Sequence, residues 1–250
     1  VLLLRKLGIH TMAADFDKAV TGVTLATESL VFYMMTPPDT GATDPRMTRF
    51  LQALEPVKAP RIVYLSTSGV YGDCGGQWVD EESPVNPRTD RARRRLDAEN
   101  QLMAWRTRRQ GQVVILRVAG IYGPGRLPLA PLRKKLPVIA AGQAPFSNRI
   151  HADDLVSVCA AAMAKGRDGE IYNVADGTPG TMTDYFNRVA DLKKLDRPPV
   201  IDREQARHDL PATMLSYLQE SRRLDVGKML KEFELELRYP TLDQGLPASL

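Results

Sequence analysis

Short apolar runs recur along the chain and alternate with segments of helical periodicity. This alternation predicts a parallel β-sheet with helical crossovers, that is, an α/β doubly wound fold. The run Leu30–Met35 is apolar at successive positions, so we expect helices to cover both faces of that strand. The expected strands are Ile9–Ala14, Leu30–Met35, Arg61–Leu65, Val113–Val118 and Glu170–Val174.

Helical patterns fill the intervals between these runs. One helix is predicted to begin after Pro87, with Thr89 or Asp90 as its N-cap. His151 precedes Asp153 and Asp154, and we expect it to cap or brace the helix that follows. Further helical patterns cover Leu2–Leu7, Val156–Met163, Thr183–Leu192, Asp209–Gln219 and Leu224–Glu232.

With 250 residues and 43% hydrophobic composition, the chain can bury a sizeable core. No stretch is apolar and long enough to span a bilayer, and the apolar Val1–Leu4 meets Arg5 too soon for a secretory signal. The two cysteines, Cys74 and Cys159, form neither a metal-ligand nor a disulfide pattern. We therefore expect free thiols, a cytoplasmic location, no bound metal and no membrane partner.

Positive charge is concentrated on one predicted helix. Eight arginines between Arg88 and Arg109 face three acidic residues, a local balance of +5 in a chain of net charge +4. Such a helix could bind nucleic acid phosphates, but Trp105 is its only aromatic residue and binders usually spread basic residues over a surface. A solvated face and contact with an anionic small ligand are the favoured interpretations, and nucleic acid is the weakest.

Three hydroxyl residues, Ser66, Thr67 and Ser68, directly follow the strand Arg61–Leu65. They would lie at the carboxyl edge of the sheet, where ligands of open α/β folds bind. The alternative is that they only cap the following turn.

Several segments, in this order, resemble the extended short-chain dehydrogenase/reductases, the NAD-dependent epimerase/dehydratase family. They are residues 61–72 (RIVYLSTSGVYG), 79–84, 114–124 (VILRVAGIYGP), 149–155 (RIHADDL) and 169–176. The resemblance implies a Rossmann-like sheet that binds NAD or NADP, with a small carboxyl-terminal lobe for a small-molecule substrate. It implies an incomplete dinucleotide-binding domain over residues 1–124 and 153–175, and a substrate-binding lobe over 125–152 and 176–250.

The family's sheet opens with a strand, a Gly-x-x-Gly-x-x-Gly turn and a helix that receives the cofactor's pyrophosphate. This sequence contains no such glycine pattern, and Asp15 matches the residue that ends the family's third strand. We therefore expect the chain to be truncated at its amino terminus, without the first strand and the glycine-rich loop.

The family's catalytic Tyr and Lys lie four residues apart on one helix, beside a Ser/Thr on the neighbouring strand. Matching Glu99 to the family's Glu places Arg91 at the Tyr position and Arg95 at the Lys position, and Thr67 matches the Ser/Thr. A guanidinium can donate hydrogen bonds but has no neutral form near pH 7, so Arg91 cannot replace a phenol. The spacing turns Arg91 and Arg95 toward the cleft, and we expect Arg94 and Arg108 to be exposed elsewhere.

The resemblance also assigns residues to the cofactor. Met34, Met35 and Thr36 would pass under its ribose and nicotinamide, with Ala119 and Gly120 approaching from another strand. Asp15, Ser66 and Arg95 complete the implied set. Gly120 stands where epimerases often carry an Asn that holds the diphosphate of a nucleotide sugar.

The sequence thus predicts an NAD(P)-dependent epimerase, dehydratase or reductase that acts on a sugar-like or nucleotide-linked hydroxyl compound, with arginines suited to an anionic substrate. A non-catalytic NAD(P)-binding sensor or scaffold is the alternative, because it explains the missing Tyr directly. The oligomeric state stays open, a homo-oligomer included. Other candidates for proton transfer are Tyr71, Tyr122, Asp80, Glu81 and His151.

Overall fold

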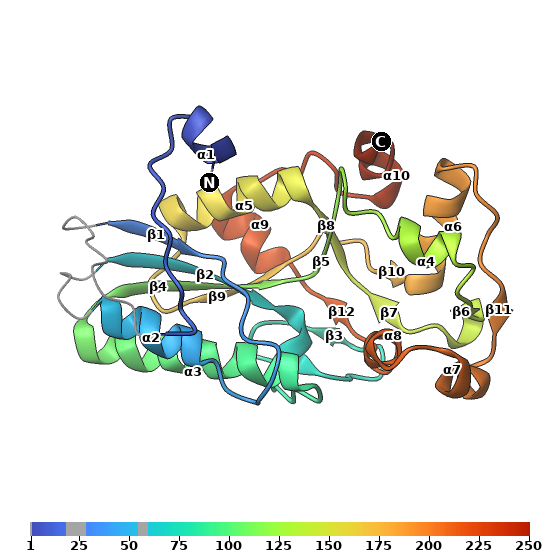
Figure 1. Ribbon diagram of the computed structural model, residues 1–250, viewed down its shortest axis with the longest axis horizontal. Helices are drawn as coiled ribbons and strands as arrows, with labels where there is room; N and C mark the ends of the chain where they lie inside the picture. Colours follow the sequence, from blue (N-terminus) through green and yellow to red (C-terminus); the bar gives the residue numbers. More distant parts are fainter. Residues whose placement is uncertain (1, 19–28, 55–59) are drawn as a thin grey trace.

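A four-stranded parallel sheet forms the centre of the computed structural model, which describes residues 2–18, 29–54 and 60–250 (Figure 1). The strand order is β1–β2–β4–β9, and all three pairings are parallel. This arrangement confirms the predicted α/β fold. The strands are β1 (Leu30–Tyr33), β2 (Arg61–Thr67), β4 (Gln112–Val118) and β9 (Ile171–Val174).

Helices cover both faces of the sheet, as the doubly wound fold requires (Figure 1). On one face Phe50 and Trp105 pack in a buried cluster with Tyr64 of β2, and on the other Val158 and Phe233 pack in a cluster with residues of β2 and β4. The helices are α2 (Pro45–Ala53) and α3 (Asp90–Arg109) on the first face, and α5 (Ala152–Lys165) and α9 (Gly227–Phe233) on the second.

Strand β1 departs from the expected burial on both faces. Leu30, Phe32 and Met34 are 65%, 41% and 54% exposed, whereas Tyr33 on the opposite face is buried. Helix α5 packs over β2 and β4, and an apolar groove of about 350 Å³ remains between it and Phe32 and Met34. Among the described residues, no strand pairs with the outer edge of β1.

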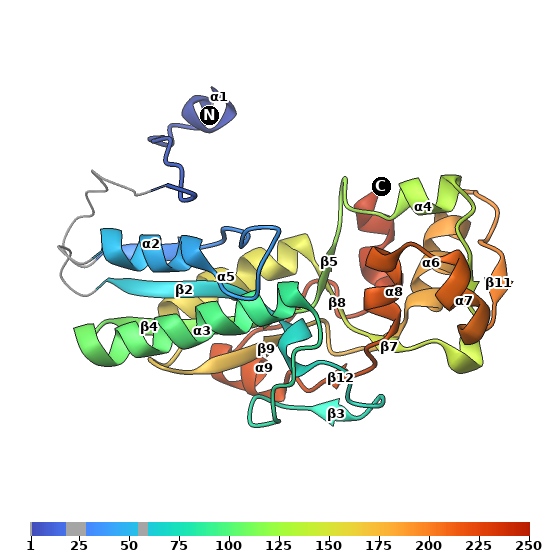
Figure 2. The ribbon, with the colours of Figure 1, turned by 60° about the horizontal axis from the view of Figure 1, so that its bottom comes forward.

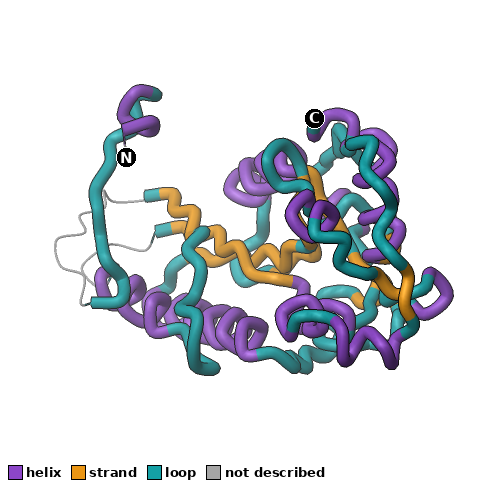
Figure 3. The backbone as a smooth tube through the Cα atoms, turned by 45° about the vertical axis from the view of Figure 1, so that its right-hand side comes forward, coloured by secondary structure: helices purple, strands orange, loops and turns teal. Residues whose placement is uncertain are grey.

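The expected strand Ile9–Ala14 is wrong. Residues 9–15 have no regular secondary structure, and Ile9 and Met12 are 48% and 60% exposed. A strand needs a hydrogen-bonding neighbour, and this segment pairs with none of the described strands. The preceding helix α1 (Leu2–Lys6) forms as predicted, and it stands apart from the sheet (Figure 3).

Beyond the carboxyl ends of the strands lies a lobe of short helices and two-stranded pairs (Figure 2). Its buried residues form two small clusters of their own. Its helices are α4 (Leu129–Arg133), α6 (Met182–Leu192), α7 (Arg203–Asp209), α8 (Ala212–Leu218) and α10 (Leu242–Gly245). The short pairs are β5 (Gly120–Tyr122) with β8 (Arg149–His151), β6 (Val138–Ile139) with β11 (Val200–Ile201), β7 (Phe146–Ser147) with β10 (Gly180–Thr181), and β3 (Trp78–Val79) with β12 (Arg223–Leu224). The 3-10 turns are η1 (Ser68–Tyr71), η2 (Ala141–Gln143) and η3 (Pro247–Ser249).

Local signals decide the helix ends. Thr89 caps α3 by accepting a hydrogen bond from the Ala92 amide, and His151 Nδ1 caps α5 by accepting one from the Asp153 amide, 3.2 Å away. The expected single helix over Asp209–Gln219 is wrong: Pro211 has no amide hydrogen to donate, and the chain forms α7 and α8 on either side of it.

The predicted division into a dinucleotide-binding domain and a lobe stays a prediction. Helix α9, which the prediction assigns to the lobe, buries Met229 and Phe233 in the same cluster as the strands of the central sheet.

Candidate functional site

A cleft of about 430 Å³ lies at the carboxyl ends of β2 and β4, between the sheet and the lobe. Figure 1 shows these strand ends directed at the lobe. The sheet side contributes Ser66, Thr67, Ser68, Gly69, Arg91, Arg95, Val118, Ala119, Gly120 and Ile121, and the lobe side contributes Arg126, Phe146, Ser147, Asn148, Arg149, Met182, Glu220 and Arg222. The position is the one that the fold class predicts for a ligand.

The hydroxyl residues at the carboxyl end of β2 line this cleft, and two of them also make hydrogen bonds within the protein. Thr67 Oγ1 accepts a hydrogen bond from the Gly69 amide at 3.2 Å, so it caps the turn that begins at Ser68. Ser66 Oγ donates to Glu99 Oε1 of α3. With its hydrogen committed to Glu99, Ser66 presents its oxygen to the cleft as an acceptor.

A row of buried polar residues crosses three adjacent strands at this level. The register pairs Ser66 of β2 with Arg117 of β4, and Arg117 with Asn173 of β9. All three are at most 6% exposed. Glu99 accepts from Arg117 Nη2 at 2.9 Å and from Arg117 Nε at 3.3 Å, which makes a buried ion pair directly behind Ser66.

The Arg117 guanidinium also lies 4.8 Å from the ring centre of Tyr71, in a cation–π contact. Burial disfavours the charged guanidinium, but the hydrogen bonds and the negative charge of Glu99, together with Tyr71, outweigh burial and raise the pKa of Arg117. Arg117 Nη1 is buried without a hydrogen-bond partner. This ion pair fixes the α3 side of the cleft, and the sequence showed Arg117 only as part of a strand motif.

Helix α3 brings Arg91 and Arg95 into the cleft, as the helical spacing predicted. Arg95 Nη1 donates to the carbonyl oxygens of Leu65 and Met35, at 3.0 and 3.2 Å, and so ties the end of β1 to β2. Arg91 Nη1 donates to Ser216 Oγ of α8 at 3.0 Å. Arg91 therefore links the sheet domain to the lobe.

The prediction of an exposed Arg94 is wrong. Arg94 is 7% exposed, its Nη1 donates to the Gly41 carbonyl at 2.6 Å, and its Nε has no partner. The loop before α2 covers this side of α3, which periodicity within the helix cannot reveal. Arg93 pairs with Asp90 and Arg106 with Asp168, so α3 presents no continuous basic face of the kind that nucleic acid binding favours.

The missing side chain of Gly120 makes room for Arg149. A Cβ at position 120 would lie 2.5 Å from Arg149 Nη1. Arg149 stacks on Tyr185, 4.4 Å from the ring centre, and burial lowers the pKa of its guanidinium. Its Nε has no hydrogen-bond partner, so a cationic donor with an uncommitted N–H lies beside Gly120 of strand β5.

The residues predicted to hold the cofactor do not all meet in the cleft. Ser66, Arg95, Ala119 and Gly120 line it. Met35 and Thr36 follow β1, where their carbonyl oxygens accept from Arg95 and Arg46. Met34 lies in the apolar groove beside α5. Asp15 belongs to the exposed amino-terminal segment, pairs with Lys18 at 3.6 Å, and does not line the cleft.

Sequence reasoning missed the lobe's contribution to the cleft. Arg126, Arg222 and Glu220 come from segments without a recognised motif, and Arg149 stood in a motif without an assigned role. Arg222 Nη1 donates to the Gly72 carbonyl at 2.6 Å and to Glu220 Oε2 at 2.9 Å. Five arginines thus face one carboxylate in the cleft, a charge balance that favours an anionic ligand.

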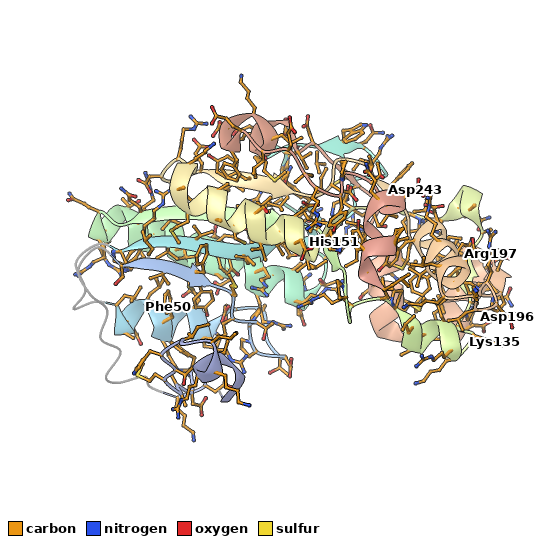
Figure 4. All side chains as sticks on the ribbon, turned by 90° about the horizontal axis from the view of Figure 1, so that it is seen from above. Phe50, Lys135, His151, Asp196, Arg197 and Asp243 are labelled. Atoms are coloured by element: carbon orange, nitrogen blue, oxygen red, sulfur yellow. The ribbon has the colours of Figure 1, made fainter. Side chains whose placement is uncertain are left out.

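The five other candidates for proton transfer do not line the cleft. Tyr71 donates to Asn173 Oδ1 at 2.8 Å, and burial raises the pKa of its hydroxyl. Tyr122 is fully buried beside His151, with 5.2 Å between the ring centres (His151 is labelled in Figure 4). Glu81 accepts from the Asn173 amide at 2.7 Å, and Asp80 pairs with Ser83. These side chains support the fold around the cleft.

A second cavity of about 320 Å³ adjoins the cleft and shares Glu220 with it. Ile139, Ala206, Leu215 and Leu218 give it apolar walls. Its polar residues are Asp73, Arg88, Thr89, Arg203, Arg207, Ser216, Gln219 and Glu220. A ligand with a ring system and an anionic group could span both cavities past Glu220.

Within the described residues, no three His, Cys, Asp or Glu side chains gather to hold a metal ion. Likewise, none of the described helices has the length and apolar character that crossing a membrane requires.

A doubly wound parallel sheet with hydroxyl residues at its strand ends, facing a lobe across a polar cleft, is the architecture of short-chain dehydrogenase/reductase-like proteins. Residues 45–175, just over half of the chain, match the family described as the NAD dependent epimerase/dehydratase family, and the chain belongs to this family. The expected membership is confirmed.

The chain is also similar to individual known proteins. Protein YeeZ of Escherichia coli K12 is 28% identical over 188 residues, which cover 73% of this chain and 60% of YeeZ. A dTDP-glucose 4,6-dehydratase of Streptomyces niveus is 32% identical over 152 residues, 56% of this chain and 44% of the dehydratase. The solved structure of a functionally unknown conserved protein from Silicibacter pomeroyi DSS has a TM-score of 0.76 and 33% identity, and the match covers 88% of this chain and 76% of that one. The chain thus spans at most three fifths of these two curated relatives.

Proposed function

We propose that this chain belongs to an NAD- or NADP-dependent enzyme that acts on a hydroxyl group of a sugar-like or nucleotide-linked compound with an anionic group. The observation that carries the proposal is the cleft itself, where hydroxyl residues and five arginines surround the carboxyl ends of β2 and β4. The likeness to a dTDP-glucose 4,6-dehydratase supports a nucleotide-linked substrate.

The strand ends suit the nicotinamide half of the cofactor. Ala119 and Gly120 bring backbone to the cleft without bulky side chains, and Ser66 offers an acceptor oxygen held by Glu99. The sequence contains no Gly-x-x-Gly-x-x-Gly turn for the pyrophosphate, so only the strand-end residues are assigned to the cofactor. A bound nicotinamide would exchange a hydride with the substrate carbon.

The arginines suit the substrate. Guanidinium groups pair bidentately with phosphate or carboxylate oxygens. Arg126 is exposed at the mouth of the cleft and Arg149 is partly buried beside Gly120, so they lie at two depths. Arg91 and Arg95 can orient a ligand but cannot take its proton.

The test is calorimetric titration with NAD, NADP and UDP, followed by a turnover assay with dTDP-glucose and UDP-glucose. We expect saturable binding of one dinucleotide, and we expect Arg126→Ala to weaken UDP binding by about tenfold, the loss of one charge-assisted hydrogen bond. Arg133→Ala, which removes an exposed arginine outside the cleft, is the matched control.

Two outcomes would change the proposal. Dinucleotide binding without turnover of any hydroxyl compound would favour the non-catalytic sensor or scaffold, and a gain of turnover in the double variant Arg91→Tyr, Arg95→Lys would strengthen that conclusion. Absence of dinucleotide binding would refute the proposal itself.

A further inference from the structure

Glu220 is the only acidic residue among the described residues that line the cleft. It is 7% exposed and lies between α8 and β12. The next residue anchors the segment, because the Ser221 carbonyl accepts from the amides of Cys74 and Gly76 at 3.1 and 2.9 Å, and the Ser221 amide donates to Asp73 Oδ1 at 3.0 Å. The carboxylate is therefore held at a fixed place in the wall of the cleft.

The two oxygens of this carboxylate differ. Oε2 accepts from Arg222 Nη1 at 2.9 Å, whereas Oε1 is buried without a hydrogen-bond partner. A buried carboxylate oxygen without a donor destabilises the protein, and native structures keep few such groups. A donor brought by a ligand would satisfy Oε1.

The other polar groups of the cleft cannot serve a ligand hydroxyl in the same way. The arginines are donors only, and Thr67 already accepts from the Gly69 amide. Ser66 can accept a hydrogen bond, but it cannot pass a proton on to its neighbour Glu99. The Glu99 carboxylate is already bound in an ion pair with Arg117. Among these groups, only Glu220 combines a negative charge with an uncommitted oxygen.

We propose that Glu220 recognises a hydroxyl group of the substrate at Oε1 and accepts its proton during the reaction. The proposal rests on the proposed function. The hydroxyl O–H bond breaks, a new O–H bond forms on Oε1, and the electron pair remains on the substrate oxygen. Arg222 stays hydrogen-bonded to Oε2. Glu220 thereby does the acid–base work that Arg91, at the family's Tyr position, cannot do.

The position of Glu220 suggests which ligand parts meet it. It lines both the cleft and the second cavity, so a nucleotide-linked sugar that spans the two would pass its carboxylate. UDP-glucose and UDP are suitable probes, because they share the charged nucleotide and only the first carries sugar hydroxyls.

The first experiment measures binding by calorimetry with the whole chain. We expect the wild-type protein to bind UDP-glucose more tightly than UDP, and Glu220→Gln to lose on the order of 10- to 100-fold in affinity for UDP-glucose, the range for a hydrogen bond to a charged group. Its affinity for UDP should change by less than about threefold, since Gln can still accept from Arg222. Glu232→Gln, which alters a carboxylate bound to Arg167 outside the cleft, should leave both affinities unchanged.

Several results would overturn the inference. Equal losses for UDP and UDP-glucose in Glu220→Gln would indicate a structural role for the carboxylate. Equal affinities of UDP and UDP-glucose in the wild-type protein would also refute it, while dinucleotide binding would leave the proposed function standing. Absence of all dinucleotide and UDP binding would refute both.

The second experiment tests whether Glu220 accepts the proton of the substrate hydroxyl. We expect Glu220→Gln to lose most of kcat, because an amide cannot accept the proton of the substrate hydroxyl. Sodium formate should restore part of the turnover of Glu220→Ala, because a small carboxylate can enter the vacated space. No rescue by formate, or an unchanged kcat in Glu220→Gln, would contradict a proton-accepting role.

Discussion

The buried ion pair behind Ser66 supports a quantitative prediction for Glu99→Gln. The substitution keeps the shape of the side chain and removes its charge, which leaves the Arg117 guanidinium uncompensated. The two side chains are 3% and 5% exposed, so water cannot replace the lost partner. Removing one partner of a buried pair costs about 3–5 kcal/mol.

For a chain of 250 residues this loss corresponds to a fall in Tm of about 6–10 °C, from the average unfolding entropy per residue. The assay is urea unfolding followed by circular dichroism, with thermal unfolding as a second measure. Lys135→Ala is the control, since Lys135 and Asp196 form a pair at 71% and 83% side-chain exposure (both are labelled in Figure 4). Exposed pairs contribute about 0–1 kcal/mol.

A second variant separates loss of the pair from loss of one partner. Glu99→Leu combined with Arg117→Met replaces both charges by apolar groups, and we expect it to be more stable than Glu99→Gln alone, because no charge stays buried. A loss below about 1 kcal/mol in Glu99→Gln, with an unchanged dependence on urea, would refute the reasoning.

Three further predictions concern single positions. Gly120→Ala should displace Arg149 and weaken UDP binding about tenfold, measured by calorimetry, with less than about 1 kcal/mol lost in stability because a flexible side chain can move aside. Arg94→Glu should cost at least about 3 kcal/mol in urea unfolding, whereas the exposed Arg108→Glu should stay within about 0.5 kcal/mol. Burial raises the pKa of Asp176 to about 6, so the folded state loses stability as the pH rises from about 4 to 6. We therefore expect Asp176→Asn to stabilise the protein at pH 7 by up to about 3 kcal/mol. In thermal scans this gain in stability should vanish near pH 4.

The sequence was sufficient to predict the sheet where each strand carries its own signal. Arg61–Leu65 and Val113–Val118 combine apolar runs with clear ends, and both form central strands. Ile9–Ala14 carries a similar pattern and forms none, because strand formation depends on a neighbour that local sequence cannot supply. Local sequence also could not show that the apolar side chains of β1 lie exposed along a groove that none of the described helices fills.

For the candidate site, too, the sequence predicted the residues placed by local periodicity and missed those placed by distant contacts. Helical spacing was enough to place Arg91 and Arg95 together, because both lie on one face of a single helix. It was not enough for Arg94, which is buried by the loop that carries Gly41, more than fifty positions earlier in the chain. Glu220 and Arg222 reach the cleft through a segment that hydrogen-bonds to the loop around Cys74, a contact across most of the chain length.

The chemistry of the cleft depends on the arginines that line it. Arg91 adds a permanent positive charge, and among the described residues four more arginines line the same space. Their combined positive charge favours an anionic group on the ligand. Glu220 accepts from Arg222 through Oε2 only, and its Oε1 has no hydrogen-bond partner. An arginine cannot act as a general base near neutral pH, so the proposed acid–base role of Glu220 requires that the ligand hydroxyl reach this carboxylate. That geometric condition separates an active enzyme from a binding protein.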